Sequence, residues 1–145
     1  MVEEITIIIA IIGVIIGSIS LLRQFWKERV RFTCQVVKSY WYPPEKHLNS
    51  KWYSISIEML FKNLGNQSTT IHHVSISFTY EKQKYNRTDE IQIILDSGDS
   101  ITQRFSFSFN ENELIIDKNL TNIKLQIEHT YKTIIKTIDE IPKLR

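Results

Sequence analysis

Hydrophobic residues follow two different patterns along this chain. The first stretch, Ile5–Leu22, holds no charged residue, and an apolar run of this length predicts a membrane-spanning helix. At about 1.5 Å rise per residue it is roughly 27 Å long, close to the thickness of the bilayer hydrocarbon. From Val30 onward, apolar and polar residues alternate, which is typical of half-buried β-strands. We therefore expect a transmembrane α-helix over residues 5–26 and an all-β domain over residues 32–145.

Two alternatives to a membrane anchor are a cleaved signal peptide and a buried core helix. A signal peptide begins with basic residues, whereas the predicted N-terminal tail, residues 1–4, carries two glutamates and the apolar run continues into Leu-Leu-Arg-Gln-Phe-Trp. A core helix keeps a polar stripe, whereas only Thr6, Ser18 and Ser20 hydrogen-bond strongly here, and a helix satisfies such side chains on its own backbone. A membrane anchor therefore fits the sequence better than a signal peptide or a core helix.

The charges on the two sides of this run predict its orientation. No Lys or Arg precedes it, whereas Arg23 and the basic flank, residues 27–31, follow it. Cations near a span are retained on the cytoplasmic side, which predicts an external N-terminus and a cytosolic β-domain. Aromatic residues at the end of the span are typical of the headgroup layer. The residues expected to meet membrane lipid are Arg23, Phe25, Trp26, Lys27, Arg29 and Arg31.

Small residues recur within the span at Ala10, Gly13 and Gly17. The motif Gly13-Val-Ile-Ile-Gly17 leaves room for the backbone of a second helix, which is how transmembrane helices associate. The implied partner is an integral membrane protein or a second copy of this chain. Glycine is also frequent in membrane helices, so a chance match is the alternative.

The rest of the chain suffices for one domain. It holds seven alternating stretches, at residues 30–36, 53–62, 74–80, 91–95, 105–109, 123–127 and 131–138. The breaks between them are rich in turn residues and lie at Tyr42–Ser50, Asn63–Ser68, Tyr85–Thr88, Asp96–Asp99, Asn110–Asn122 and His129–Thr130. Seven short strands with no helical period between them predict two antiparallel sheets packed face to face.

Outside its basic flank the chain is nearly neutral. Of its 18 Lys and Arg residues, four lie at positions 23–31, leaving 14, and of its 16 Asp and Glu residues, three lie before position 32, leaving 13. Nucleic-acid binding needs a basic face, so no nucleic-acid partner is expected. A single cysteine, Cys34, excludes an internal disulfide and agrees with a reducing compartment. Glycosylation sequons at Asn66, Asn86 and Asn119 favour the opposite location, with the domain outside the cytoplasm.

Candidate catalytic and metal-binding residues form no recognisable set. His72 and His73 are neighbours in a predicted strand and should point to opposite faces, which is unsuited to one shared ion. Cys34 alternates with Phe32 and Val36, as a small core residue would. The other candidates are dispersed or lie in polar loops without calcium-loop or hydrolase spacing: His47, His129, Asp96, Asp99, Glu111, Glu113 and Asp117. No enzyme activity, metal, cofactor or small-molecule substrate is expected.

One aromatic segment favours contact with a partner. It consists of Tyr40, Trp41, Tyr42, Pro43 and Pro44, with Trp52 after a polar loop. Strand alternation places the two tyrosines on one side and Trp41 on the other, so at least one large ring should lie near the surface. Exposed aromatic rings beside stiff prolines are typical contact anchors. The alternatives are a rim at the open end of the sandwich and a ring resting on the membrane.

Three stretches carry a resemblance to known sequences: Ser56–Gly65, Ser68–Phe78 and Leu95–Phe107. They resemble the strand and turn pattern of a widespread group of uncharacterised prokaryotic single-span proteins. The resemblance implies an immunoglobulin-like β-sandwich of about seven strands behind the membrane helix, and it carries over no functional residue. In the first turn, Gly65 is expected to adopt a positive φ and Asn63 to cap free amides.

These observations predict a single-pass membrane protein whose cytosolic sandwich is a non-catalytic binding module, an accessory or scaffold subunit of a membrane complex. The alternatives are an envelope structural protein with its domain outside the cytoplasm, and a membrane-acting defence component that works through its span.

Overall fold

The computed structural model describes residues 2–27, 31–45 and 49–144. These residues form one helix, α1 (Val2–Lys27), followed by strands β1 (Phe32–Tyr42), β2 (Trp52–Asn63), β3 (Thr69–Tyr80), β4 (Gln83–Leu95), β5 (Ser100–Asn110), β6 (Leu120–His129) and β7 (Lys132–Ile141). Every pairing between these strands is antiparallel. The prediction of one helix and seven antiparallel strands is therefore confirmed.

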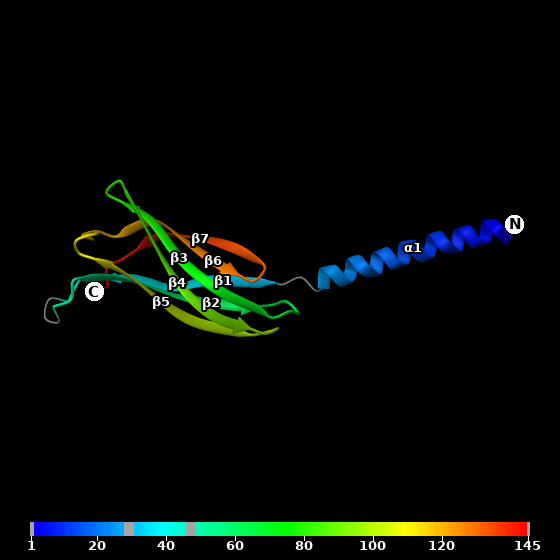
Figure 1. The fold of residues 1–145 in the computed structure, drawn as a ribbon, viewed down its shortest axis with the longest axis horizontal. Coiled ribbons are helices and arrows are strands. Elements are labelled where there is room, and N and C mark those ends of the chain that lie inside the picture. Colours follow the sequence, from blue (N-terminus) through cyan, green and yellow to red (C-terminus); the bar gives the residue numbers. More distant parts are fainter. Residues whose placement is uncertain (1, 28–30, 46–48, 145) are drawn as a thin grey trace.

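Helix α1 extends away from the β-domain (Figure 1). Its described side chains are exposed. The segment Ile5–Phe25 is long and apolar enough to cross a membrane. The helix begins at Val2 and so includes residues 2–4 ahead of this apolar segment.

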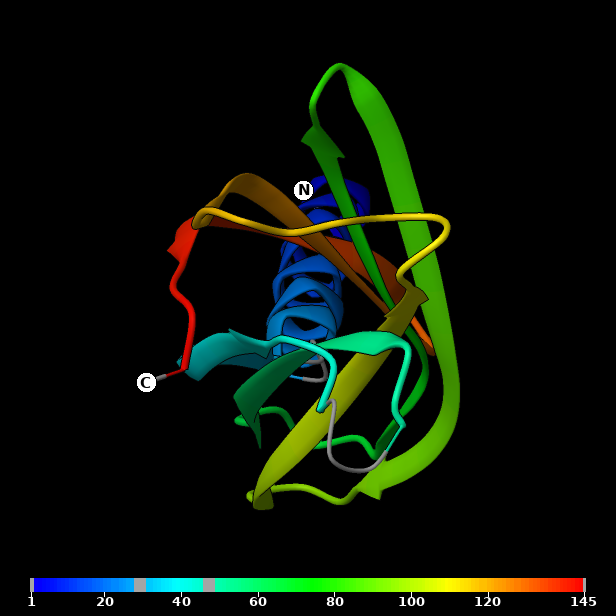
Figure 2. The same cartoon turned by 90° about the vertical axis from the view of Figure 1, so that its left-hand side faces the viewer.

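The seven strands form two sheets, one with the order β1-β2-β5 and the other with the order β4-β3-β6-β7. Figure 2 views the domain from the end opposite α1 and shows the two sheets as separate layers. Apolar side chains from both layers fill the space between them, as in the case of Ile55, Phe61, Phe105 and Phe107 from the first sheet and Ile76, Leu125 and Ile127 from the second. The predicted row of phenylalanines on β5 is thus in the core.

A β-bulge in β1 changes which residues face the core. The register with β2 shifts between Val36 and Lys38. Before the bulge the even-numbered Cys34 is buried, and after it the odd-numbered Trp41 is buried. Because one extra residue reverses the alternation, Tyr40 lies on the outer face of the sheet.

A second bulge lies in β3 between Ile71 and His73. Ile71 is buried before it and Val74 after it. His72 and His73 border one surface hollow of about 370 Å³ together with Glu90. The expectation that the two histidines point to opposite faces is wrong, because the bulge interrupts the alternation at this pair.

The β3–β4 hairpin turns at Glu81 and Lys82, whose φ angles are 48° and 68°. A two-residue hairpin turn of this kind needs positive φ at both central positions. The turn predicted at Tyr85–Thr88 is wrong, since these residues pair with β3 inside β4. Tyr85 stacks on Phe78 with ring centroids 5.4 Å apart, and this cross-strand packing prevails over the turn-like composition.

The connections between strands lie at two ends of the β-domain (Figure 1). The β2–β3, β4–β5 and β6–β7 turns lie at the helix-proximal end, where β1 begins. The β1–β2 and β5–β6 connections and the C-terminus lie at the distal end. Ten residue steps of about 3.3 Å along β1 place Tyr42 roughly 33 Å from Phe32.

Asn63 organises the helix-proximal end. Its side-chain oxygen accepts a hydrogen bond from the amide of Gly65 at 3.1 Å, which confirms the predicted cap. Its side-chain nitrogen donates to the carbonyl oxygens of Gln67 at 2.7 Å and Leu95 at 3.0 Å. The positive glycine φ at this end, 83°, belongs to Gly98 and not to Gly65 as expected.

Candidate binding surface

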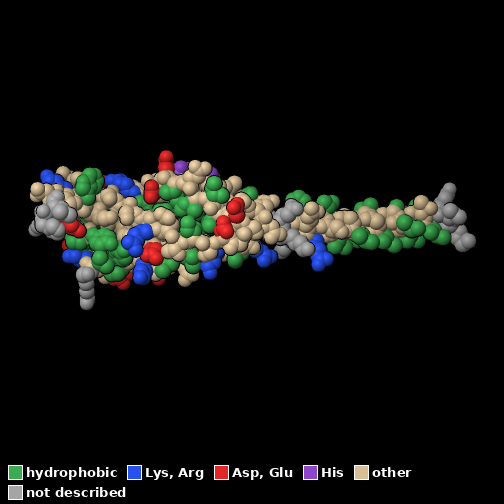
Figure 3. Space-filling view, turned by 90° about the horizontal axis from the view of Figure 1, so that it is seen from below, with side chains coloured by type: hydrophobic (Ala, Val, Ile, Leu, Met, Phe, Trp, Pro, Cys, Tyr) green, Lys and Arg blue, Asp and Glu red, His purple; other side chains and the backbone are tan. Residues whose placement is uncertain are grey.

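Aromatic residues gather on the outer face of the three-stranded sheet, at the distal end. Tyr40 and Tyr42 lie opposite Ser56 and Ser54 of β2. We define the distal aromatic surface as Tyr40, Tyr42, Pro43, Pro44 and Trp52. Figure 3 shows hydrophobic side chains gathered towards this end of the domain.

The two tyrosine rings are held in a fixed arrangement. Their centroids lie 5.0 Å apart and their planes meet at 84°, an edge-to-face geometry that aromatic rings prefer. Hydrogen bonds with Tyr42 and then with Ser56 lower the pKa of Tyr40, and the bond to Tyr40 raises the pKa of Tyr42.

A surface hollow of about 470 Å³ lies beside this pair, lined by Tyr42, Pro43, Glu45, Ser50, Trp52 and Ser54. Trp52 is 51% exposed, although it is large and apolar. Aromatic rings with a few polar groups around them are typical of protein contact sites. The hollow is therefore the candidate contact site of this surface.

Trp41 does not belong to this surface, and its prediction as a contact residue is wrong. It is 2% exposed because the β1 bulge turns it into the core. Its amide donates to the carbonyl oxygen of Pro142 at 3.0 Å, and its carbonyl oxygen accepts from the amide of Leu144 at 2.9 Å. Trp41 thus joins β1 to the segment that follows β7.

The aromatic segment lies far from the end of α1. Helix α1 ends at Lys27, whereas Tyr42 and Trp52 lie at the distal end of the β-domain. A contact surface, a rim of the domain and a ring resting on the membrane stay the three interpretations of this segment.

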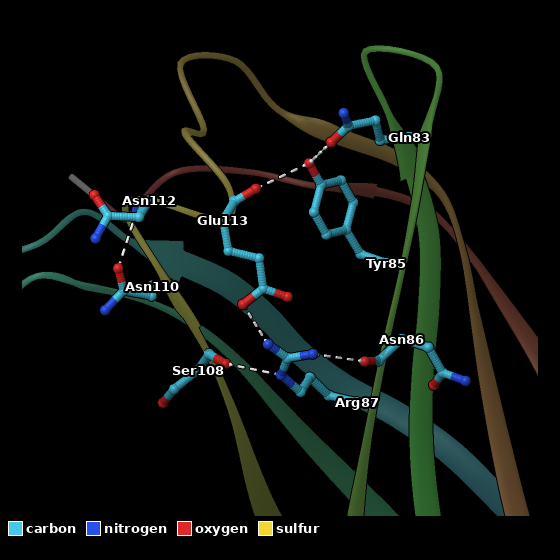
Figure 4. A network of polar contacts seen from close by, with 8 residues as sticks. All are labelled: Gln83, Tyr85, Asn86, Arg87, Ser108, Asn110, Asn112 and Glu113. Carbon is cyan, nitrogen blue, oxygen red and sulfur yellow. Dashed lines mark hydrogen bonds and ion pairs between the residues drawn. The ribbon is translucent and has the colours of Figure 1, made fainter.

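A polar network beside the distal end connects the two sheets (Figure 4). The Arg87 guanidinium donates to the carbonyl oxygen of Ser108 at 3.3 Å, forms an ion pair with Glu113 and lies 4.8 Å from the Phe109 ring centre. The Tyr85 hydroxyl donates to the carbonyl oxygen of Glu113 at 3.2 Å. These contacts tie β4 to β5 and to the loop after it, so the cluster has a structural role.

The candidate catalytic and metal-binding residues of the sequence lie at separate places in the structure. Cys34 is buried, as predicted, and burial raises the pKa of its thiol. Asp117 accepts a hydrogen bond from the Tyr80 hydroxyl, and Asp96 accepts one from Ser68. Among the residues that the structure describes, no three His, Cys, Asp or Glu side chains are grouped to hold a metal ion. His47 lies outside the described residues.

His129 is a buried polar residue that its sequence position did not single out. It is 3% exposed, its Nδ1 lies 3.1 Å from the Thr69 hydroxyl, and its ring centre lies 4.5 Å from that of Phe32. Burial, followed by the charges of Lys132 and His72, lowers the pKa of its imidazole. The alternation of β6, in which His129 follows the inward-facing Ile127, was the available signal.

The residues predicted to meet lipid are described only in part. Arg31 is exposed beside the start of β1, and Arg23 and Phe25 are exposed on the last turns of α1. Arg29 and the side chains of Trp26 and Lys27 lie outside the described residues. On α1, a Cβ added at Gly13 or Gly17 would meet no described atom within 4 Å other than those of its own residue, its chain neighbours and the nearby helix backbone.

Comparison with known proteins identifies a similar fold and no family. No protein-family model and no curated protein matches the chain. The crystal structure of a Bordetella pertussis protein, provisionally assigned as ApaA, is similar at a TM-score of 0.53 and 12% sequence identity, over 81% of this chain and 98% of that chain. The sporulation control protein Spo0M of Bacillus subtilis covers 80% of this chain and 50% of its own at a TM-score of 0.37 and 10% identity. The first likeness concerns the fold alone.

Proposed function

We propose that this chain is a membrane-anchored, non-catalytic binding module, an accessory or scaffold subunit of a membrane complex. The observation that carries this proposal is the distal aromatic surface, where Trp52 is half exposed beside a hollow of about 470 Å³. Removing such a ring from water on binding is strongly favourable, and aromatic anchors dominate protein interfaces. The proposed partner is therefore a protein that inserts an apolar segment beside Trp52.

Helix α1 is the proposed anchor, with the β-domain in the cytosol. Its exposed apolar surface over Ile5–Phe25 needs lipid or a partner to cover it. The cations Arg23 and Arg31 follow the apolar segment and none precedes it, which supports a cytosolic domain.

The proposed mechanism is attachment at two places. The flank of α1 with Ala10, Gly13 and Gly17 packs against a transmembrane helix of the partner or of a second copy. The distal aromatic surface binds a cytosolic part of the same complex. Because the first contact holds the second in place, the effective concentration of the second contact rises to the millimolar range for a short connection.

The immunoglobulin-like assignment of the domain is part of the proposal. Immunoglobulin constant domains have the sheets ABED and CFG. The sets β1-β2-β5 and β3-β6-β7 have the order of strands A-B-E and C-F-G, and β4 pairs with β3 instead of with β5. This order supports membership of the group of prokaryotic single-span proteins that the sequence resembles.

The proposal is tested by purification of the full chain in mild detergent with its companions. Replacing Trp52 with serine should weaken a companion's affinity by about thirtyfold, as loss of a 2 kcal/mol hot spot would. Ile135→Ser is the matched control, because Ile135 is also a large, exposed apolar residue and lies on the other sheet. Companions that are retained equally by both variants would contradict the proposed surface.

An envelope protein with an extracytoplasmic domain is the second candidate. The observation that favours it is that all three sequon asparagines, Asn66, Asn86 and Asn119, are exposed. A mass decrease on enzymatic deglycosylation of the native protein would support this candidate and contradict a cytosolic domain.

A further inference from the structure

Leu64 is an exposed apolar residue at the helix-proximal end of the β-domain. It lies in the β2–β3 turn and is 60% exposed. The residues that follow it in the turn and are exposed, Asn66, Gln67 and Ser68, are polar. Transfer of this apolar side chain out of water is favourable.

The turn holds Leu64 outward and gives it no route into the core. The fully buried Asn63 side chain binds three backbone groups, including the amide of Gly65 on the far side of Leu64. The Gly65 carbonyl oxygen also accepts a hydrogen bond from the Ser97 hydroxyl at 2.7 Å. The residues on both sides of Leu64 are therefore fixed to the β4–β5 turn.

Leu64 is also joined directly to the chain that leaves α1. Its amide donates to the carbonyl oxygen of Arg31 at 2.7 Å. Arg31 is four residues beyond Lys27, where α1 ends, so their Cα atoms are separated by at most about 14 Å. The polar layer of a bilayer is about 5–8 Å thick on each side. With α1 in a membrane, this short connection keeps Leu64 close to the bilayer surface.

Neighbouring residues at this end suit a lipid surface. Tyr131, in the β6–β7 turn, is 50% exposed, and its hydroxyl donates to the carbonyl oxygen of Ser68 at 3.2 Å. The side chains of Lys62 and Lys132 are exposed beside the two turns. Tyrosine rings and cations are favoured at the headgroup layer. The carboxylates of Asp96 and Asp99 are hydrogen-bonded within this end of the domain.

We propose that the β2–β3 turn rests on the membrane that holds α1, with the Leu64 side chain at the boundary between headgroups and acyl chains and Tyr131 beside it. This contact fixes the tilt of the β-domain and directs the distal aromatic surface away from the bilayer. The inference rests on the proposed membrane anchoring, and its occupant is the lipid surface itself.

The test places a fluorophore on Leu64→Cys in the full chain, reconstituted in vesicles of phosphatidylcholine and phosphatidylglycerol that include a nitroxide-bearing phospholipid. Ile115→Cys is the control, since Ile115 is an equally exposed apolar residue at the distal end. Buried Cys34 is left in place, and peptide masses verify where the label is attached. We expect quenching at position 64 to exceed that at position 115 by about twofold or more, as for an interfacial position. Tyr131→Cys, labelled in the same way, provides a second quenching measurement at the helix-proximal end.

Alkaline carbonate treatment of the same vesicles separates this inference from the anchoring. A chain that stays in the vesicles and is quenched equally at positions 64, 131 and 115 overturns the contact and leaves the anchor intact. A chain that is released by carbonate overturns both.

Discussion

The side-chain amide of Asn63 donates a hydrogen bond of 3.0 Å to the carbonyl oxygen of Leu95, joining two turns that are 32 residues apart. The same residue exchanges backbone hydrogen bonds with the β4–β5 turn, since its carbonyl oxygen accepts from the Gly98 amide at 2.8 Å and its amide donates to the Asp99 carbonyl oxygen at 2.9 Å. One buried side chain thus fixes the end of the domain that faces α1.

Asn63→Ala should destabilise the β-domain by about 2–3 kcal/mol, because it leaves the Gly65 amide and the Leu95 and Gln67 carbonyl groups without this partner. Urea unfolding of the full chain in detergent, followed by tryptophan fluorescence, measures the change. Asn86→Ala, at an exposed position of β4, should cost less than about 0.5 kcal/mol. Equal effects of the two substitutions would contradict the role assigned to Asn63.

The two tryptophans of the β-domain should respond differently to substitution. Trp41→Ala removes a buried ring that packs 6.2 Å from that of Tyr53, with an expected loss of about 3–5 kcal/mol. Trp52→Ala, at the surface, should change the free energy of unfolding by about 0.5 kcal/mol or less. The same unfolding experiment distinguishes them, and a large effect at Trp52 would show that it is part of the core.

Stability should fall on mild acidification through His129. Burial holds the pKa of His129 below its usual value of 6.5, so the unfolded chain takes up this proton at a higher pH than the folded chain. The stabilising contribution of neutral His129 is therefore complete above about pH 6.5 and is lost as the pH falls through the unfolded and then the folded pKa.

We expect His129→Gln to flatten the loss of unfolding free energy between about pH 7 and 5. Urea midpoints across this range provide the measurement, and parallel slopes in the wild type and His129→Gln would exclude His129 as the source.

The contacts of Arg87 together should stabilise the β-domain more than its ion pair with Glu113 does alone. Both side chains of the pair are more than a third exposed, so Glu113→Gln should cost at most about 1 kcal/mol. Arg87→Ala also removes the contacts with Ser108 and the Phe109 ring, and we expect a larger loss. Thermal unfolding of the two variants compares them, and equal losses would show that the ion pair alone accounts for the cluster.

Strand number and core composition could be predicted from sequence because alternation is local. Phe105, Phe107 and Phe109 are separated by serines and all three are buried, as a period of two requires. The cap at Asn63 was equally accessible, since the amide that its side-chain oxygen caps, that of Gly65, lies two residues away. The bond to Leu95 depends on how distant strands pair, and no local pattern reveals it.

Two bulges and one unmarked turn account for the errors in strand alternation and turn placement. The shift between Val36 and Lys38 reverses the alternation. Even-numbered residues such as Cys34 face the core before the shift, and odd-numbered residues such as Trp41 face it afterwards. Glu81 and Lys82 adopt positive φ without glycine or asparagine, so the turn there gave no signal. Such features depend on cross-strand packing more than on local propensity.

The sequence predicted which segment forms the candidate surface but not where that segment lies in the fold. Tyr42 and Pro43 are close in sequence to the β1–β2 loop, so their association with Trp52 was foreseeable. The distance of this loop from α1 was not, because it depends on β1 running the length of the domain. This distance separates the candidate surface from the end of α1.

The central claim is that lipid surrounds α1, and alkaline carbonate extraction of native membranes tests it most directly. The account predicts that the full chain stays in the membrane pellet, while a variant lacking Ile5–Leu22 is recovered in the supernatant. Release of the full chain by carbonate would contradict the account.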